Sequence, residues 1–267
     1  MSKVVLITGG SSGIGKSIGE FLSKLDFVVV GTSRNPNNYQ NSSIPLYALD
    51  VTQNASILSC IDQVKKEHGT IDILINNAGA GITGPVEEIP DAEIRRNFDI
   101  NFFGPINVIK GILPIMRSQN SGLIINITSI AGYMGLPYRG PYSASKSALG
   151  IITEAFRMEI KDTAIQMCNL APGDFATNIA AGRYHAPVIK GSPYETKYSE
   201  VLNTINDDVN TAGDPQLVAK AILKIINSKR PKIHYKVGTF MQKISVLLKA
   251  ILPDKAYEKL LSKHYNL

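Results

Sequence analysis

The amino-acid sequence predicts an α/β fold in which helices cover both faces of a doubly wound parallel sheet. Short apolar runs typical of buried strands alternate with segments of helical periodicity, the pattern of parallel βαβ units. The first strand leads directly into a glycine-rich turn at residues 8–15, TGGSSGIG, and then into a helical segment. At 267 residues and 44% hydrophobic content, residues 1–267 are expected to form a single domain.

Each expected strand is a short, mostly apolar run bounded by turn residues. The expected strands cover residues 4–8, 27–32, 46–50, 71–76, 123–129, 165–171 and 232–237. The run at 71–76 is apolar almost throughout, as a strand covered on both faces requires.

The expected helices are recognised by apolar periodicity and by their end signals. They cover residues 15–25, 52–67, 91–118, 142–161 and 214–229. Thr52 is placed to cap the second helix and Gly69 to end it, and the third is expected to bend near Gly104-Pro105. Residues 173–213 interrupt the alternation with Gly, Pro, Tyr, Asn and charge but little periodicity, so we expect a functional lid there.

The glycine-rich turn indicates a dinucleotide site. Gly9, Gly13 and Gly15 allow a tight turn and a close backbone approach to a pyrophosphate. The free N–H groups at the start of the following helix favour an anion. Packing of helix on strand is the alternative reason for such glycines.

The end of the second strand indicates which dinucleotide binds. NAD sites usually offer a carboxylate there, whereas the run here is Gly31-Thr32-Ser33-Arg34. Arg34 is suited to pair with a 2′-phosphate and Ser33 to donate a hydrogen bond to it, so NADP(H) is the expected cofactor. The alternative for Arg34 is a solvated loop arginine.

Polar residues also follow the third and fourth strands. Asp50 is suited either to bind the adenine amino group or to act as a cap before Thr52. Asn76 and Asn77 end the fourth strand, where open α/β sheets bind ligands. A structural role is expected for Asn76, whereas Asn77 is suited to face the cofactor ribose, and the sequence alone does not separate the two roles.

Ser129, Tyr142 and Lys146 suggest catalysis. Tyr142 and Lys146 are four residues apart on an expected helix and therefore share a face, which brings a cation near the phenol. A neighbouring cation favours ionisation of the phenol, which makes it a proton donor or acceptor. Ser129 ends a strand thirteen residues earlier, and Asn101 lies within the long helix.

These motifs, in this order over roughly residues 3–180, resemble the short-chain dehydrogenase/reductase family in its standard-length branch. The resemblance implies a Rossmann-type parallel sheet of about seven strands in the order 3-2-1-4-5-6-7. It implies Tyr142 as general acid/base, Ser129 as the group that positions the carbonyl, and Lys146 as a ribose ligand that lowers the Tyr142 pKa. It also implies that Asn101 holds a water for proton relay.

The resemblance extends the expected cofactor site from the glycine turn to Thr177. It implies that Thr177 bonds the nicotinamide carboxamide. The expected cofactor-contacting residues are Gly9, Ser11, Ser12, Gly13, Ile14, Gly15, Ser33, Arg34, Asp50, Val51, Asn77, Ala78, Gly79, Tyr142, Lys146, Pro172, Gly173, Phe175 and Thr177.

Apolar and aromatic residues near the expected site favour a hydrophobic ketone, aldehyde or alcohol as substrate. They lie in the 132–138 loop and, within the lid, at Phe175, Ile179, Tyr184, Tyr194 and Tyr198. Packing of the lid is the alternative role for these aromatics. Residues 81–88 and the basic carboxyl-terminal extension resemble 17β-hydroxysteroid and retinol dehydrogenase-like members, which act on steroids, retinoids and other lipid-like carbonyls.

Two other functions remain open from sequence. A 3-oxoacyl-thioester reductase of the same family would need no apolar, basic extension, and a non-catalytic NADP(H) sensor or scaffold would not need an intact Ser/Tyr/Lys set. The four histidines, His68, His185, His234 and His264, lack metal-ligand spacing, so no metal is expected.

Charge is concentrated at the carboxyl end. Residues 220–267 carry eleven Lys or Arg and two acids, whereas residues 1–219 are net acidic. No nucleic-acid recognition motif accompanies this charge, so nucleic-acid binding is not expected. The extension at 239–267 has one apolar helical face, which suits contact with a membrane, a partner subunit or the domain itself. A cytoplasmic location, with peripheral membrane contact, and a homodimer or homotetramer are expected.

Overall fold

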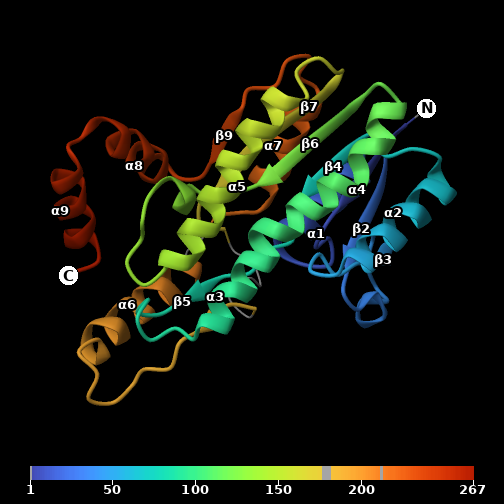
Figure 1. The fold of residues 1–267 in the computed structure, drawn as a ribbon. Coiled ribbons are helices and arrows are strands. Elements are labelled where there is room, and N and C mark those ends of the chain that lie inside the picture. The colour runs from blue at the N-terminus through green and yellow to red at the C-terminus, as the bar shows by residue number, and fades with distance from the viewer. Residues whose placement is uncertain (1, 176–181, 211–212) are drawn as a thin grey trace.

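The computed structural model describes residues 2–175, 182–210 and 213–267. Its main sheet has seven parallel strands in the order β3-β2-β1-β4-β6-β7-β9 (Figure 1). The strands are β1 Lys3–Ile7, β2 Phe27–Ser33, β3 Leu46–Ala48, β4 Ile73–Asn76, β6 Gly122–Ile127, β7 Ile165–Pro172 and β9 His234–Val237. Because β5 Ile82–Thr83 and β8 Tyr184–His185 pair separately, the main sheet has the predicted 3-2-1-4-5-6-7 order, which is confirmed.

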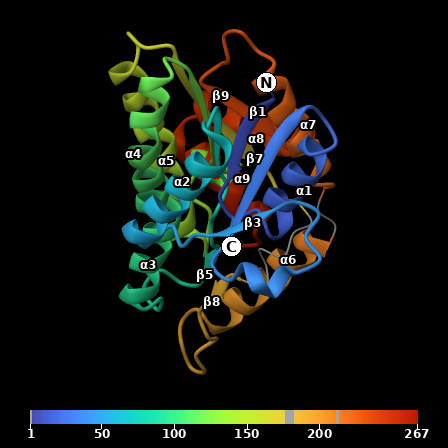
Figure 2. The ribbon, with the colours of Figure 1, turned by 90° about the vertical axis from the view of Figure 1, so that its right-hand side faces the viewer.

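Two helical layers enclose the sheet, as Figure 2 shows from the side. One layer contains α2 Asn54–His68, α4 Gly104–Ser118 and α5 Gly140–Glu159, and the other contains α1 Gly13–Leu22 and α7 Gln216–Ile226. Alternate strand residues pack toward opposite layers, as Leu6 and Ile7 do on β1. Both faces are apolar, which explains why the strands read as nearly continuous hydrophobic runs.

The long helix predicted at 91–118 is interrupted earlier than expected. It consists of α3 Asp91–Phe98, a π-helical turn η2 at Asp99–Phe103, and α4. Pro105 has no N–H to donate, and the N–H of Gly104 bonds the carbonyl of Asp99, five residues back. The bend therefore begins at the π turn, which also contains Asn101.

Of the two residues predicted to mark the ends of the second helix, Gly69 does so and Thr52 does not. Gly69 adopts a left-handed conformation with φ 78° and ends α2, as predicted. Thr52 is not the cap, because its N–H and hydroxyl both donate to the Asp50 carboxylate, at 2.9 and 2.8 Å. This local bonding holds Thr52 in the turn, and α2 begins after Gln53.

The predicted lid is more ordered than its sequence indicates. Residues 173–213 include β8 and the helix α6 Glu195–Asn210, so regular structure lies where the sequence shows little periodicity, and the lid role stays a prediction. Tyr198 and Val201 are buried at helical spacing, but the polar residues between them mask the periodicity. The Tyr198 hydroxyl bonds the carbonyls of Thr83 and Ala186, which anchors α6 to the β5–β8 pair.

The carboxyl-terminal extension forms two helices, α8 Phe240–Ile251 and α9 Asp254–His264, which lie at the left of the layered body in Figure 1. A capping box of Thr239 and Gln242 starts α8. Val246 and Tyr257 pack against Ile130 and Met134, so the inner side of the extension covers the domain. Within the described part of the chain, no helix combines the length and apolarity needed to cross a membrane.

Candidate active site

The glycine-rich turn forms one wall of a cleft of about 930 Å³ at the carboxyl end of the sheet. Gly9 and Gly13 have φ of 67° and 53°, a conformation that side chains disfavour. A Cβ on Gly15 would overlap the carbonyl oxygen of Gly9 and the amide of Asn77. Ser12 precedes α1 without a side-chain cap, so the first N–H groups of the helix remain open to an anion.

Most of the predicted cofactor residues line this cleft. They are Gly9, Ser11, Ser12, Gly13, Ile14, Ser33, Arg34, Asp50, Val51, Asn77, Ala78 and Gly79. Gly15 acts behind the turn through close packing, and Thr177 lies outside the described residues. A glycine cradle at a helix start, with an arginine at the end of β2, fits a dinucleotide with its pyrophosphate on the turn.

The two asparagines that end β4 have separate roles. Buried Asn76 donates to Asn126 Oδ1 at 2.9 Å, linking β4 to β6 inside the sheet. The Asn77 amide donates to the carbonyls of Thr8 and Gly9, each at 3.0 Å, and the residue lines the cleft. Asn76 is therefore structural, and Asn77 holds the glycine turn in shape at the cofactor cleft.

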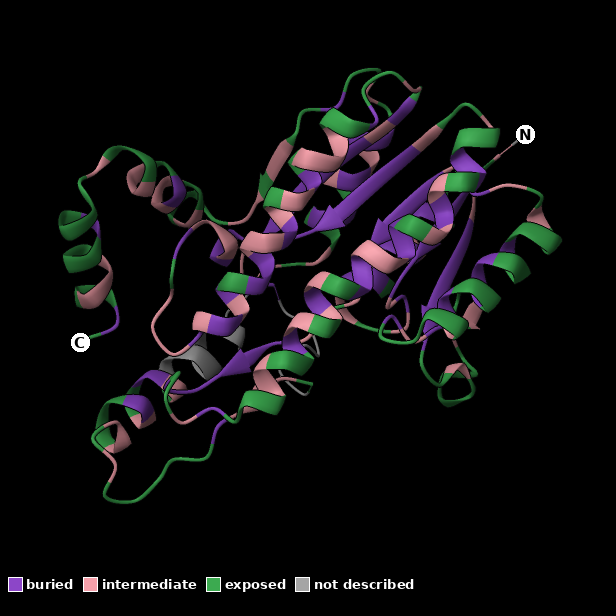
Figure 3. Ribbon diagram, viewed as in Figure 1, coloured by how far each residue is buried: buried purple, intermediate pink, exposed green. Residues whose placement is uncertain are grey.

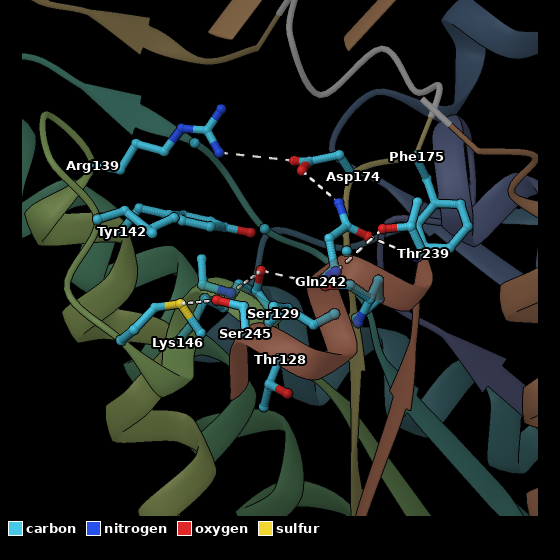
Figure 4. A pocket seen from close by; sticks show the side chains of 18 of the residues that line it. Thr128, Ser129, Arg139, Tyr142, Lys146, Asp174, Phe175, Thr239, Gln242 and Ser245 are labelled. Carbon is cyan, nitrogen blue, oxygen red and sulfur yellow. Dashed lines mark hydrogen bonds and ion pairs between the residues drawn. The ribbon is translucent and has the colours of Figure 1, made fainter. Parts of the chain in front are cut away.

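A second cavity, of about 610 Å³, contains Ser129, Tyr142 and Lys146. It shares Ile14, Asn77, Gly79 and Arg183 with the first, so the two are adjacent. Pro172, Gly173 and Phe175, predicted as cofactor contacts, line this second cavity. In Figure 4 the Tyr142 phenol projects from α5 toward the Ser129 side of the cavity.

Tyr142 has a raised pKa, mainly because burial disfavours the phenolate. The neighbouring Ser129 hydroxyl and the charge of Arg139 oppose this rise in the pKa, and the charge of Arg183 also lowers it. Ser129 is itself held at the end of β6, where its hydroxyl accepts from the N–H of Ala131 at 3.2 Å.

Lys146 is buried at the carboxyl end of β6. Its ammonium donates to the carbonyl of Ile127 at 3.0 Å, and burial lowers its pKa to about 8. The cations that lower the Tyr142 pKa are Arg139 and Arg183, and burial outweighs them. The roles expected for Lys146, as a ribose ligand and as the cation that lowers the Tyr142 pKa, stay predictions.

Asn101 links the π turn to the segment after β4. Its Oδ1 accepts from the N–H of Ala80 and its Nδ2 donates to the carbonyl of Ala80, both at 2.9 Å. A Cβ on Gly79 would lie 3.1 Å from Asn101 Oδ1 and 3.3 Å from Lys146 Nζ. Glycine at this position thus leaves open the gap between Asn101 and Lys146.

Sequence reasoning missed several polar residues of the second cavity, among them Arg139, Asp174, Arg183 and Gln242. Arg139 precedes Tyr142 by three residues, a helical spacing that could have found it. The others come from distant segments. Asp174 lies between Arg139 and Gln242 (Figure 4), with Gln242 Nε2 donating to Asp174 Oδ2 at 2.9 Å.

The remaining walls of this cavity are mostly apolar. Met134 and Leu136 contribute from the 132–138 loop, as predicted, and Ile244 and Leu248 contribute from α8. The aromatic residues of the predicted lid mostly pack elsewhere. Phe175 lines this cavity, Tyr184 lines the cofactor cleft, Tyr198 is buried with α6, the Tyr194 hydroxyl bonds Glu87, and Ile179 lies outside the described residues.

Comparison with curated proteins identifies full-length relatives. A 3-ketodihydrosphingosine reductase of Bacteroides thetaiotaomicron is 36% identical over 264 residues, covering 98% of each chain. Retinol dehydrogenase 8 of Bos taurus is 28% identical over 274 residues, covering 94% of this chain and 86% of the relative. The predicted resemblance to retinol dehydrogenase-like members is confirmed by this second relative.

Solved structures share the fold. A short-chain dehydrogenase from Streptomyces avermitilis superposes with a TM-score of 0.81 at 29% identity, covering 97% of this chain and 95% of that one. Other structural neighbours are complexes with NAD or with NADP. The family model for short chain dehydrogenases matches residues 3–187, over the glycine turn and the Ser/Tyr/Lys set. This chain belongs to the short chain dehydrogenase family of oxidoreductases.

Proposed function

We propose that this protein is an NADP(H)-dependent oxidoreductase that interconverts a lipid-like ketone and its alcohol, with Tyr142 as general acid/base. The observation that carries the proposal is that the Ser129 and Tyr142 side chains line one mostly apolar cavity, which is adjacent to the glycine-lined cleft. Ile14, Asn77 and Gly79 line both cavities, so a dinucleotide on the turn would extend toward the phenol.

In the reduction, charge develops on the carbonyl oxygen as the carbonyl carbon gains a hydride. A nicotinamide cofactor supplies that hydride when bound. The Ser129 and Tyr142 hydroxyls donate to the oxygen, and Tyr142 transfers its proton to give the alcohol. A raised pKa keeps the phenol protonated before the reaction, which suits a general acid.

The preference for NADP(H) rests on Arg34. It lies with Ser33 and Asp50 in the wall of the cofactor cleft, at the end of β2. The Asp50 carboxylate is bonded by Thr52, so it is partly engaged within its own turn. An arginine at this position can form charge-assisted hydrogen bonds with a 2′-phosphate, which NADH lacks.

The substrate class rests on the apolar cavity walls and on the relatives. Met134, Leu136, Ile244 and Leu248 can hold a long or bulky hydrocarbon. The two curated relatives are named for a long-chain sphingoid ketone and for retinol, both lipids. A long-chain ketone with a polar head is the substrate we propose to test first.

A carbonyl panel tests this function. Purified protein is assayed by the loss of NADPH absorbance with 3-ketodihydrosphingosine, retinal, a steroid ketone and a 3-oxoacyl thioester. We expect the highest kcat/KM with a lipid ketone. Preference for the 3-oxoacyl thioester would instead support the acyl-thioester reductase, and NADPH binding without turnover of any carbonyl would support a non-catalytic sensor.

The proposal includes peripheral contact between the α8–α9 extension and an anionic membrane. Phe240, Leu247 and Ile251 fall on one side of α8 and are 72%, 56% and 68% exposed. Figure 3 shows exposed positions along the outer sides of α8 and α9. Met241 and Leu260 are exposed and also line the substrate cavity, so this apolar surface continues into the cavity.

The positive charge of α8 and α9 favours an anionic bilayer as the partner of their exposed apolar side. Lys243, Lys255 and Lys259 are exposed on the same two helices, where the extension is strongly basic. Apolar burial and attraction to anionic lipids together hold interfacial helices at a membrane. A lipid substrate would then lie close to the opening of the cavity.

Co-sedimentation with vesicles tests the membrane contact. The intact protein is expected to bind vesicles rich in phosphatidylglycerol, and to bind phosphatidylcholine vesicles more weakly. Replacing Phe240, Leu247 and Ile251 together by serine is expected to abolish binding, whereas Leu58→Ser, an exposed apolar residue on α2, is the matched control. Equal sedimentation of the triple variant would contradict the contact, and a change in oligomer size instead would identify a second copy as the occupant.

A further inference from the structure

Besides Lys146, three charged side chains, Arg139, Asp174 and Arg183, line the mostly apolar cavity that holds Tyr142. Their charges all act on the Tyr142 phenol, which places them around the reacting end of the cavity. Figure 4 shows the Arg139 guanidinium and the Asp174 carboxylate on the same side of the Tyr142 ring. The hydrocarbon-lined walls need no such charges, so the cluster calls for its own explanation.

Arg139 is not fully satisfied by the protein. It is 8% exposed, and its Nε is buried without a partner among the described residues. Its Nη1 lies 3.8 Å from Asp174 Oδ1, which is longer than a hydrogen bond. The two charges attract each other but leave hydrogen-bonding capacity on both groups.

Arg183 also has a buried hydrogen-bond donor without a partner among the described residues. Its side chain lies against Gly81, where a Cβ would come within 2.9 Å of its Cγ and Nε. Its Nη1 is buried and has no hydrogen-bond partner in the part of the chain that the structure describes. A buried donor without an acceptor is costly, and a ligand oxygen that bonds this guanidinium would compensate that cost.

Asp174 supplies the acceptor. Its Oδ2 accepts from Gln242, and its side chain is 43% exposed within the cavity. A carboxylate has about four lone-pair positions, so this one can accept further hydrogen bonds. The carboxylate follows Gly173 directly, in the segment that leaves β7 beside Ser129.

We propose that Asp174, Arg183 and Arg139 form a head-group site, in which Asp174 binds an amine of the substrate and the two guanidiniums bind an oxygen on the adjacent carbon. This proposal rests on the proposed function, because it places the head group beside the ketone that Tyr142 protonates. Asp174 is the acceptor for the amine, and Arg183 is the donor with unused capacity for the oxygen. The preferred substrate is therefore an amino ketone with a hydroxyl or acidic oxygen in its head and a hydrocarbon tail.

A series of ketones with one chain length tests this site. The series contains an amino hydroxy ketone, the same ketone without the amine, the same ketone without the hydroxyl, and an amino ketone whose hydroxyl is replaced by sulfonate. The kcat/KM with NADPH is measured for the intact protein, Asp174→Asn and Arg183→Gln. Arg230→Gln, on an exposed arginine outside both cavities, is the matched control.

We expect the intact protein to prefer the complete head over either truncated head by about tenfold or more, as for charge-assisted hydrogen bonds. Asp174→Asn should remove the preference for the amine and keep that for the oxygen, and Arg183→Gln should do the reverse. Arg230→Gln should keep both. The sulfonate arm shows whether the guanidiniums prefer an acidic oxygen to a hydroxyl.

Loss of folding is separated from loss of recognition by melting temperature, by NADPH binding and by Asp174→Glu, which should restore part of the amine preference. Equal loss across all four ketones in Asp174→Asn and Arg183→Gln would overturn the head-group site. So would equal turnover of all four by the intact protein, although the proposed function would then stand. Turnover of none of them, nor of any other lipid ketone, would overturn the proposed function itself.

Discussion

The ammonium of Lys146 donates a hydrogen bond of 3.0 Å to the backbone carbonyl of Ile127, at the end of β6. Lys146 is buried, and no carboxylate contributes to its pKa, which burial alone lowers to about 8. The active site thus holds a cation that is expensive to keep charged. This cost should be visible in the stability of the protein.

The first prediction concerns the pH dependence of stability. The pKa of Lys146 is about 8 in the folded protein and 10.5 in its unperturbed form, so the unfolded chain binds more protons between these values. The free energy of unfolding should therefore rise with pH across pH 8 to 10.5, by about 3 kcal/mol from this group.

Lys146→Met isolates this effect in urea unfolding. Relative to this variant, the intact protein should become more stable as pH increases through that window, whereas Lys161→Met, on an exposed lysine, should follow the intact protein. Burial raises the pKa of Cys60 and of Cys168 to about 12, so these thiols lower the stability as pH rises. Because Lys146→Met keeps both thiols, their effect cancels when its free energy of unfolding is subtracted from that of the intact protein. If the free energies of unfolding of the intact protein and of Lys146→Met differed by a constant amount from pH 8 to 10.5, the lowered pKa of Lys146 would be contradicted.

The second prediction concerns the glycine turn. In Gly15→Ala the new methyl group would overlap the Gly9 carbonyl and the Asn77 amide that hold the turn. We expect the Kd for NADPH to rise about tenfold or more, measured by quenching or enhancement of NADPH fluorescence. Gly150→Ala on α5 meets no atom within 4 Å and should leave this Kd unchanged. Unchanged binding in Gly15→Ala would show that the turn does not carry the cofactor.

The third prediction concerns cofactor choice. Arg34→Asp places a carboxylate where the 2′-phosphate of NADPH is expected, and like charges repel. The KM for NADPH should rise by about tenfold or more, while the KM for NADH should change little or fall. Arg230→Asp makes the same charge change outside the cleft and controls for net charge. Equal effects of Arg34→Asp on both cofactors would reject the phosphate role.

Much of the fold is predictable from local sequence. The apolar run before the glycine turn, the left-handed Gly69 and the doubly covered strands all depend on neighbouring residues, and each was predicted. The π turn and α6 were not, because the first depends on the missing N–H of Pro105 and the second on burial of Tyr198 and Val201 against distant strands. The expected homodimer or homotetramer stays a prediction.

The same distinction holds for the site. Ser129, Tyr142 and Lys146 were found because their spacing in sequence is short and fixed. Asp174, Arg183 and Gln242 come from separate segments and meet only through the fold, so no local pattern marks them. Charge inside an apolar cavity is a property of the tertiary structure.

Deuteride transfer tests the central claim most directly. The lipid ketone with the highest kcat/KM is incubated with NADPH deuterated at the transferred position, and the alcohol is analysed by mass spectrometry. The intact protein should give an alcohol with one deuterium, and Tyr142→Phe should lose most of this turnover, roughly a hundredfold or more, while its affinity for NADPH stays close to that of the intact protein. Near-normal deuterium transfer by Tyr142→Phe would contradict the account, because the phenol of Tyr142 would then not supply the proton.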